Sequence, residues 1–162
     1  MVGNMTERKL LLLVAHAPSP NTLKLREAVA EGARHEDVEG VDVKVLPPLE
    51  AGPDDVLTCD GIILGTTENL AYMSGALKDF FDRSYYPVLE EKQGLPCALY
   101  IRAGQDGTGT RRAVESIVTG LRRHRVQDAL GPGSYTHLTL PPGGLGAISE
   151  VRVSAQKKQK TS

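Results

Sequence analysis

Cysteine and aromatic residues are scarce in this sequence. Of its 162 residues only two are cysteines, Cys59 and Cys97, and none is tryptophan. Two isolated cysteines without C-x-x-C spacing predict neither a disulfide framework nor a zinc site, and they favour a reducing, cytoplasmic compartment. Each is expected to be a small buried hydrophobic residue. The histidines are scattered without the spacing of ligand pairs, so no metal site is expected.

The chain also lacks a strong net charge and a long apolar run. Its formal net charge is −1, which gives no global field to attract nucleic acid or an acidic membrane. No segment approaches the roughly 18–20 apolar residues of a membrane span. The apolar run at residues 10–15 precedes an A-x-A sequence that mimics a signal-peptide cleavage site. It is shorter than the roughly 7–15 residues of a signal h-region, so a first strand is the better interpretation.

Short apolar segments recur along the chain, which is expected to form one domain. They predict four strands, at residues 9–15, 41–46, 61–65 and within 94–102. Three of these segments are continuously apolar, as strands buried on both faces of a parallel sheet are. The segment at 41–46 alternates valines with Asp42 and Lys44, which predicts an edge strand.

Helices are predicted between these strands, so the fold class is expected to be α/β with a parallel sheet. The clearest helix spans residues 73–83, with an apolar face formed by Met73, Leu77, Phe80 and Phe81. A first helix is predicted to begin at Pro20, and a short helical turn lies within residues 52–59. A last helix is predicted at residues 110–125, with its inward face formed by Ala113, Ile117, Gly120 and Leu121.

Polar or glycine-rich segments follow three of the predicted strands, at residues 16–22, 66–69 and 103–109. Ligands of open α/β sheets bind at such carboxyl ends. In the first segment, Ser19, Asn21 and Thr22 lie at a helix N-terminus, which predicts an anion site that needs no positive side chain. An ordinary capped helix start is the alternative.

The third segment contains closely spaced glycines, which let the backbone approach a flat ligand. It has neither the G-x-G-x-x-G pattern nor the lysine of a P-loop. A flexible turn between strand and helix is the alternative interpretation.

Residues 65–83, GTTENLAYMSGALKDFFDR, resemble the second flavin loop and following helix of flavodoxin-like FMN proteins. The likeness is to the branch of NAD(P)H-dependent FMN reductases and quinone reductases, and it covers about residues 9–132. It implies a three-layer flavodoxin-like fold with sheet order 2-1-3-4, a doubtful fifth strand, bound FMN, NAD(P)H as the electron donor and a quinone or similar small-molecule acceptor. It leaves open whether the protein forms a homo-oligomer.

The resemblance also implies the cofactor-binding residues, and it names no catalytic side chain because the flavin carries the redox chemistry. Phosphate contacts are implied for Ser19, Asn21 and Thr22. Ribityl and ring contacts are implied for Thr66, Thr67, Glu68 and Asn69. Positions along the edge of the flavin ring are implied for Arg102, Gly104, Gln105 and Asp106. Tyr72 is expected either to flank the ring or to be an ordinary core or surface aromatic.

Two other functions are compatible with parts of the pattern. A flavodoxin-type electron carrier would bind FMN without a hydride-donor site, although such carriers are usually strongly acidic. A response-regulator receiver has the same strand order but needs an acidic pair after the first strand and a phospho-acceptor aspartate after the third. This chain has His16-Ala17 and Gly65-Thr66 at those places, which argues against a receiver.

The pattern changes near the C-terminal end of the sequence. Residues 134–141, SYTHLTLP, match the translation of a transposon end used in sequencing libraries. The resemblance implies a last strand and helix in this region, but the residues that follow lack a matching periodicity. Residues 133–162 are therefore predicted to be an irregular, non-native tail, and residues 8–132 the FMN-binding domain. A divergent native tail is the alternative.

Overall fold

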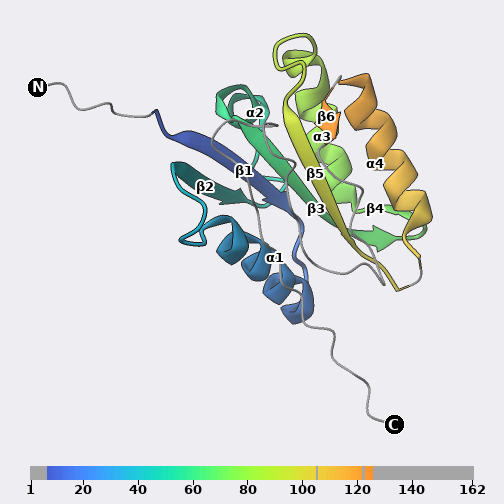
Figure 1. The fold of residues 1–162 in the computed structure, drawn as a ribbon. Helices are drawn as coiled ribbons and strands as arrows, with labels where there is room; N and C mark the ends of the chain where they lie inside the picture. The colour runs from blue at the N-terminus through green and yellow to red at the C-terminus, as the bar shows by residue number, and fades with distance from the viewer. Residues whose placement is uncertain (1–6, 105, 122, 126–162) are drawn as a thin grey trace, which may run out of the picture.

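The computed structural model describes residues 7–104, 106–121 and 123–125, and the segment predicted to be a non-native tail lies outside them. A sheet in the order β2-β1-β3-β5-β6 forms the centre of the molecule, and β4 pairs with β3 (Figure 1). All pairings along that order are parallel, whereas the β3–β4 pairing is antiparallel. The strands are β1 (Lys9–Ala15), β2 (Val41–Leu46), β3 (Gly61–Asn69), β4 (Tyr72–Met73), β5 (Pro96–Arg102) and β6 (His124–Arg125).

Helices cover both faces of this sheet (Figure 1). They are α1 (Pro20–Ala33), α2 (Pro53–Thr58), α3 (Gly75–Val88) and α4 (Thr108–Gly120). Successive residues of β1 divide between two apolar clusters: Leu11 and Leu13 pack on the α1 side, and Leu12 and Val14 pack with α3 and α4. The continuously apolar sequence of β1 therefore reflects burial on both faces, as predicted.

The predicted α/β class and strand order are confirmed. The fourth predicted strand corresponds to β5, because the hairpin strand β4 precedes it. The strand β3 lies between β1 and β5, and its register places Gly65 beside Ala15 of β1 and beside Tyr100 of β5. The carboxyl ends of β1, β3 and β5 consequently lie at the same edge of the sheet.

The helix predicted at residues 73–83 runs from Gly75 to Val88, and Met73 lies on β4. Two other predicted boundaries are wrong because the backbone pairs with a neighbouring strand. Residues 66–69 are not a loop: β3 continues through them and turns into β4 as a hairpin. The last helix ends at Gly120 instead of residue 125, and β6 pairs with the beginning of β5. In both places, pairing with a neighbouring strand determines a backbone conformation that local polarity and periodicity do not predict.

The buried face of α4 is also displaced from its prediction. Ala113 and Ile117 are only half-buried, and Gly120 is exposed. The side chains that enter the core are those of Thr110, Val114, Val118 and Leu121. Of the predicted inward residues, Leu121 is in the core, and Ala113 and Ile117 pack against its margin.

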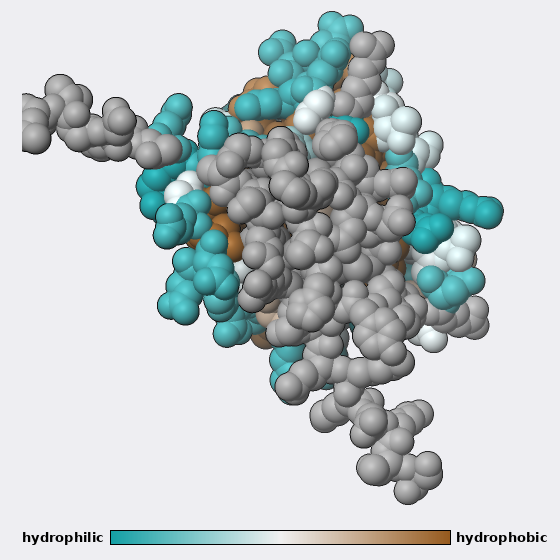
Figure 2. Space-filling model, in the orientation of Figure 1, coloured by the Kyte–Doolittle hydropathy of each residue, from teal (hydrophilic) through white to brown (hydrophobic). Residues whose placement is uncertain are grey.

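Outside the sheet, α3 is joined to the loop after β2. The Arg83 guanidinium donates to the carbonyl oxygens of Pro48 and Ala51, both at 2.8 Å, and pairs with Asp79 one turn earlier. Polar side chains form much of the described margin of the face shown in Figure 2, with smaller hydrophobic areas between them. Within the described residues, no helix is long and apolar enough to cross a membrane.

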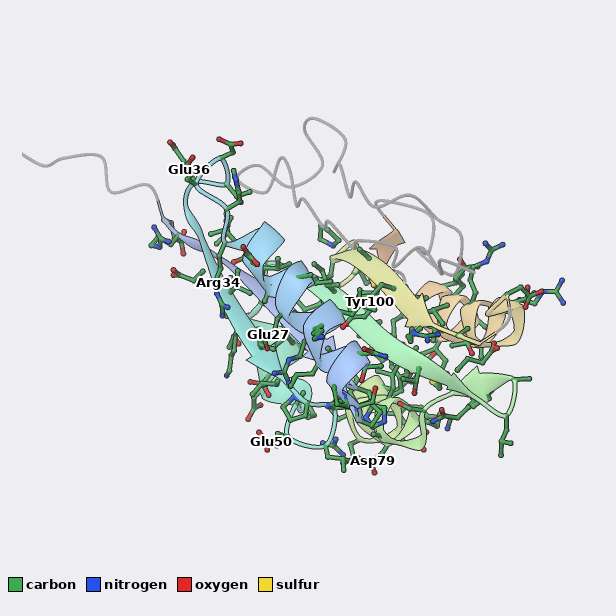
Figure 3. The ribbon with its side chains drawn as sticks, turned by 90° about the horizontal axis from the view of Figure 1, so that it is seen from below. Glu27, Arg34, Glu36, Glu50, Asp79 and Tyr100 are labelled. Atoms are coloured by element: carbon green, nitrogen blue, oxygen red, sulfur yellow. The ribbon has the colours of Figure 1, made fainter. Side chains whose placement is uncertain are left out.

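The close approach of β3 and β5 generates a stability prediction. Tyr100 extends from β5 on the α1 side of the sheet and its ring crosses Gly65 (Figure 3). A Cβ added at Gly65 would lie 2.2 Å from the ring carbon Cζ. Gly65→Ala is expected to lower the free energy of unfolding by about 2–3 kcal/mol, measured by denaturant titration, because the buried ring cannot move aside.

Gly75→Ala is the matched control, since nothing lies within 4 Å of a Cβ at that position. It should leave the free energy of unfolding within about 0.5 kcal/mol of the parent value. Equal effects of the two substitutions would show that the Tyr100 ring is not fixed over Gly65.

Candidate functional site

The three predicted ligand segments converge at the carboxyl edge of the sheet. The His16 N–H donates to the Gly65 carbonyl at 2.9 Å, which joins the segment after β1 to β3. Thr67 pairs with Arg102 across the β3–β5 ladder. The first turn of α4, which follows the third segment, reaches β3 through a 3.1 Å hydrogen bond from Thr110 Oγ1 to Glu68 Oε2. The topology therefore brings together residues that are distant in sequence.

Ser19 and Thr22 form a reciprocal cap at the start of α1. The Thr22 N–H donates to Ser19 Oγ at 3.3 Å, and the Ser19 N–H donates to Thr22 Oγ1 at 2.9 Å. Thr22 Oγ1 in turn donates to the Ser19 carbonyl at 2.9 Å. Both hydroxyls thus satisfy backbone groups that the helix start leaves unpaired. The structure realises the capped helix start, and a ligand contact by Thr22 would have to compete with it.

Asn21 differs from its two neighbours. Its side chain is exposed and makes no hydrogen bond within the described part of the chain. Pro20 has no N–H, so the backbone offers one donor fewer at the N-terminus of α1. The side-chain amide of Asn21 is an available donor there. A helix N-terminus favours negative charge, and the arrangement suits an anion.

The hydroxyl of Thr66 is directed into the protein. Thr66 is buried, and its Oγ1 donates to the Thr67 carbonyl at 2.9 Å and accepts the Ser74 N–H at 3.1 Å. Ser74 Oγ then accepts the Leu77 N–H at 3.1 Å as the N-cap of α3. The Thr66 side chain therefore positions the start of α3, and it is already fully engaged by the protein.

Exposure increases along the last residues of β3: Thr67 is still buried, Glu68 is half-buried and Asn69 is exposed. Thr67 Oγ1 donates to Asn69 Oδ1 at 3.2 Å, and Asn69 is exposed. Glu68 is half-buried beside Thr110. Tyr72 is 40% exposed on β4, so its ring is a surface aromatic next to this edge and not part of the core. These four side chains leave polar atoms and one ring face within reach of a ligand.

The third segment is open and glycine-containing. Arg102, Gly104 and Asp106 are exposed, and Gln105 lies outside the described residues. Arg102 Nη1 donates to the Ala103 carbonyl at 2.7 Å. The Thr108 N–H donates to Asp106 Oδ1 at 3.0 Å, and the hydrogen bonds from Thr108 lower the pKa of the Asp106 carboxyl. This carboxylate lies one residue before Gly107, the N-cap of α4, and it is negatively charged at neutral pH.

Sequence reasoning placed Gly109 at the end of the third segment but assigned no role to it, to Thr110 or to Ser74. A Cβ at Gly109 would lie 2.2 Å from the Ala71 carbonyl oxygen, so the β3–β4 turn packs directly on α4. Thr110 is fully buried although it is polar. A threonine on the apolar face of a predicted helix is a signal that could have identified it, because a buried hydroxyl needs a partner.

The chemistry of the two thiols is limited by burial. Burial raises the pKa of Cys59 to about 11 and that of Cys97 to about 12. Both therefore remain protonated near neutral pH and are poor nucleophiles. Among the described residues, no group of three histidine, cysteine, aspartate or glutamate side chains is placed to hold a metal ion.

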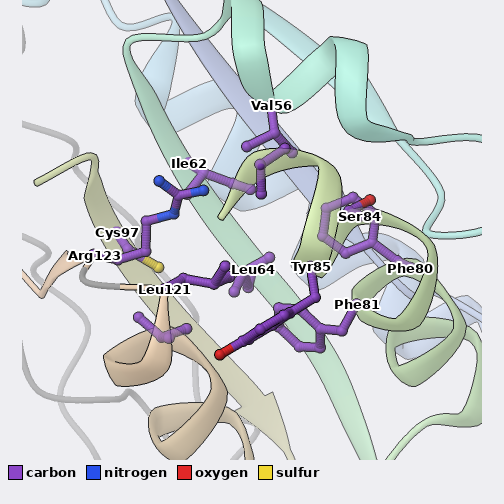
Figure 4. A pocket seen from close by; sticks show the side chains of 12 residues that line it. Val56, Ile62, Leu64, Phe80, Phe81, Ser84, Tyr85, Cys97, Leu121 and Arg123 are labelled. Carbon is purple, nitrogen blue, oxygen red and sulfur yellow. The ribbon is translucent and has the colours of Figure 1, made fainter. Parts of the chain in front are cut away.

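A small apolar cavity lies elsewhere, between α3 and α4 (Figure 4). Its walls include Phe80, Tyr85 and Leu121, with Arg123 at one end. Its floor is formed by Ile62 and Leu64 in the first half of β3, away from the carboxyl edge. The cavity belongs to the packing of the two helices and not to the candidate site.

The chain resembles proteins of known type in both sequence and fold. It is 34% identical over 111 residues to a flavodoxin of Aquifex aeolicus, an alignment that covers 68% of this chain and 59% of the relative. It is 32% identical over 92 residues to an NAD(P)H dehydrogenase (quinone) of Acidithiobacillus ferrooxidans, with 46% of each chain covered. The alignments thus span less than two thirds of either relative. No protein-family model matches.

A solved flavodoxin from the domain Archaea superposes with a TM-score of 0.63 at 18% identity, covering 75% of this chain and 82% of that one. The fold is flavodoxin-like. Strand order and layer arrangement agree with the architecture expected from residues 65–83. The strand order reverses between β1 and β3, and open α/β sheets in general bind ligands outside the carboxyl ends of the strands at such a point.

The cap at the start of α1 generates a second prediction. Ser19→Ala removes the acceptor for the Thr22 N–H and is expected to lower the free energy of unfolding by about 1 kcal/mol. Asn21→Ala is the control, because its exposed side chain has no partner in the described structure. Thermal unfolding of the ligand-free protein measures both. A loss in Asn21→Ala as large as that in Ser19→Ala would contradict the capping assignment.

Proposed function

We propose that the chain binds FMN at the carboxyl edge and transfers electrons from NAD(P)H through the flavin to a quinone or similar small acceptor. The observation that carries the proposal is the convergence of three segments at this edge, one of them a helix N-terminus with an available amide. The likeness to a flavodoxin and to a quinone dehydrogenase supports it.

The residues at the edge fit a flavin mononucleotide in polarity and exposure. Asn21 and the N-terminus of α1 would bind the phosphate through neutral donors. Thr67, Glu68 and Asn69 would offer hydroxyl, carboxylate and amide groups to the ribityl chain and ring. Thr66 would act indirectly, by holding the start of α3. Ser19 and Thr22 would contribute to the phosphate site mainly by fixing the first turn of α1.

The third segment would border the ring. Gly104 has open space around its Cα, so the backbone there is accessible to a flat ligand. Arg102 and Asp106 are exposed on either side of it, and Gln105 completes the proposed set. Tyr72 would flank the ring from the β4 side. Bound FMN would supply the hydride acceptance and electron release, and these residues bind, orient and shield it.

An electron carrier without its own hydride-donor site is the second candidate. The longer of the two curated alignments is to a flavodoxin, which favours it. The formal net charge is −1 for the whole sequence and −4 without residues 133–162. Neither value is strongly acidic, as would be expected of a carrier that docks by charge, and this favours the reductase. In either case, neither nucleic acid nor a membrane is proposed as a partner. That the chain assembles into a homo-oligomer stays a prediction.

The phosphate assignment is tested by comparing two flavins. Asn21→Ala is expected to weaken FMN binding about tenfold or more, because a hydrogen bond to a charged group contributes about 1.5–3 kcal/mol. Riboflavin, which lacks the phosphate, should bind the variant and the parent equally. Flavin fluorescence titration of the ligand-free proteins measures both affinities. Equal weakening of FMN and riboflavin would move the phosphate away from Asn21.

The choice between reductase and carrier is tested by mixing FMN-loaded protein with NADH or NADPH in a stopped-flow instrument without oxygen. A reductase loses its visible flavin absorbance in a reaction that saturates with nicotinamide concentration, and added quinone restores the absorbance. Dithionite serves as the control that shows the flavin can be reduced. Bleaching by dithionite but not by either nicotinamide would identify a carrier.

A further inference from the structure

The hairpin beside the candidate site is anchored in the core by Met73, but its turn is weakly supported by its own residues. Its turn consists of Leu70 and Ala71, with φ values of 52° and 61°. Positive φ at both turn positions is adopted most readily by the pair Asn-Gly. It is unfavourable for residues with larger side chains. The strand β4 contains only Tyr72 and Met73, and Leu70 is 102% exposed. A turn in this conformation therefore needs support from its surroundings.

The first turn of α4 provides such support. Thr110, which has 0% exposure, donates from Oγ1 to Glu68 Oε2 at 3.1 Å on the strand that leads into the turn. At Gly109, even a methyl group would come within 2.2 Å of the Ala71 carbonyl oxygen. One hydrogen bond and one backbone contact thus fix the hairpin at two places, and both come from the helix that follows the third segment.

We propose that Gly109 and Thr110 are positioning residues, which set the hairpin against the third segment and so define the wall of the site that faces the ring. This inference rests on the proposed function, because it assigns these contacts to flavin orientation. Neither residue touches the proposed phosphate region at the start of α1. Loss of the contact should therefore affect a flavin with or without phosphate to the same extent.

The positioning role can be tested first without any flavin. Thr110→Val keeps the side-chain shape and removes the donor, whereas Thr110→Ser keeps the donor. Hydrogen exchange of the ligand-free protein should be about tenfold faster at the hairpin amides in the valine variant, the size expected for loss of a hydrogen bond to a charged group. Amides of α1 should be unchanged, and the serine variant should match the parent.

A second arm uses the flavin. Thr110→Val is expected to weaken FMN and riboflavin equally, about tenfold, and to change the visible circular dichroism of the bound flavin, while Thr110→Ser restores both. Asn21→Ala weakens FMN alone, so the two substitutions give distinct patterns. If the parent protein binds no flavin, the proposed function fails, and the exchange experiment still decides whether Thr110 positions the hairpin.

Relieving the turn provides an independent check. The double substitution Leu70→Asn with Ala71→Gly supplies the residues that prefer positive φ. In that background, Thr110→Val should accelerate hairpin exchange by clearly less than it does in the parent, because the hairpin then needs less external support. The proposal is overturned if Thr110→Val leaves hairpin exchange unchanged, or accelerates exchange equally throughout the chain.

Discussion

Burial of β3 on both faces and at both edges is the constraint on which the other elements depend. Gly65 illustrates it, because the backbone of β3 at this residue lies between Ala15 of β1 and the ring of Tyr100. With both edges paired, the polar residues that end β3 can emerge only at the carboxyl edge. The ligand segments after β1 and β5 meet there for the same reason, since parallel neighbours end together.

Buried hydroxyl groups account for much of the local order at this edge. Thr22, Thr66, Ser74 and Thr110 are all buried, and each makes at least one hydrogen bond within the protein. Leaving any of them without a partner would carry a desolvation cost, so each constrains the element that it contacts. The result is a set of helix starts and strand ends fixed by buried hydroxyl groups, beside exposed residues such as Asn21 that remain available.

Sequence patterns predicted the strands and the positions of the helices because these depend on local periodicity and on burial, whereas the strand order was expected from the resemblance of residues 65–83. They also located the cap at Ser19. They did not predict the hairpin, because residues 66–69 are polar enough to suggest a loop and Leu70-Ala71 lacks the usual turn residues. The part played by Thr110 depends on a partner 42 positions away in the chain, which no local pattern reveals.

The two ends of α3 contact different loops of the carboxyl edge. At one end, Ser74 is bonded to Thr66 at the base of the hairpin; near the other, Arg83 is bonded to the carbonyls of Pro48 and Ala51 after β2. The hairpin and the loop after β2 are therefore held by the same helix, although they follow different strands of the sheet.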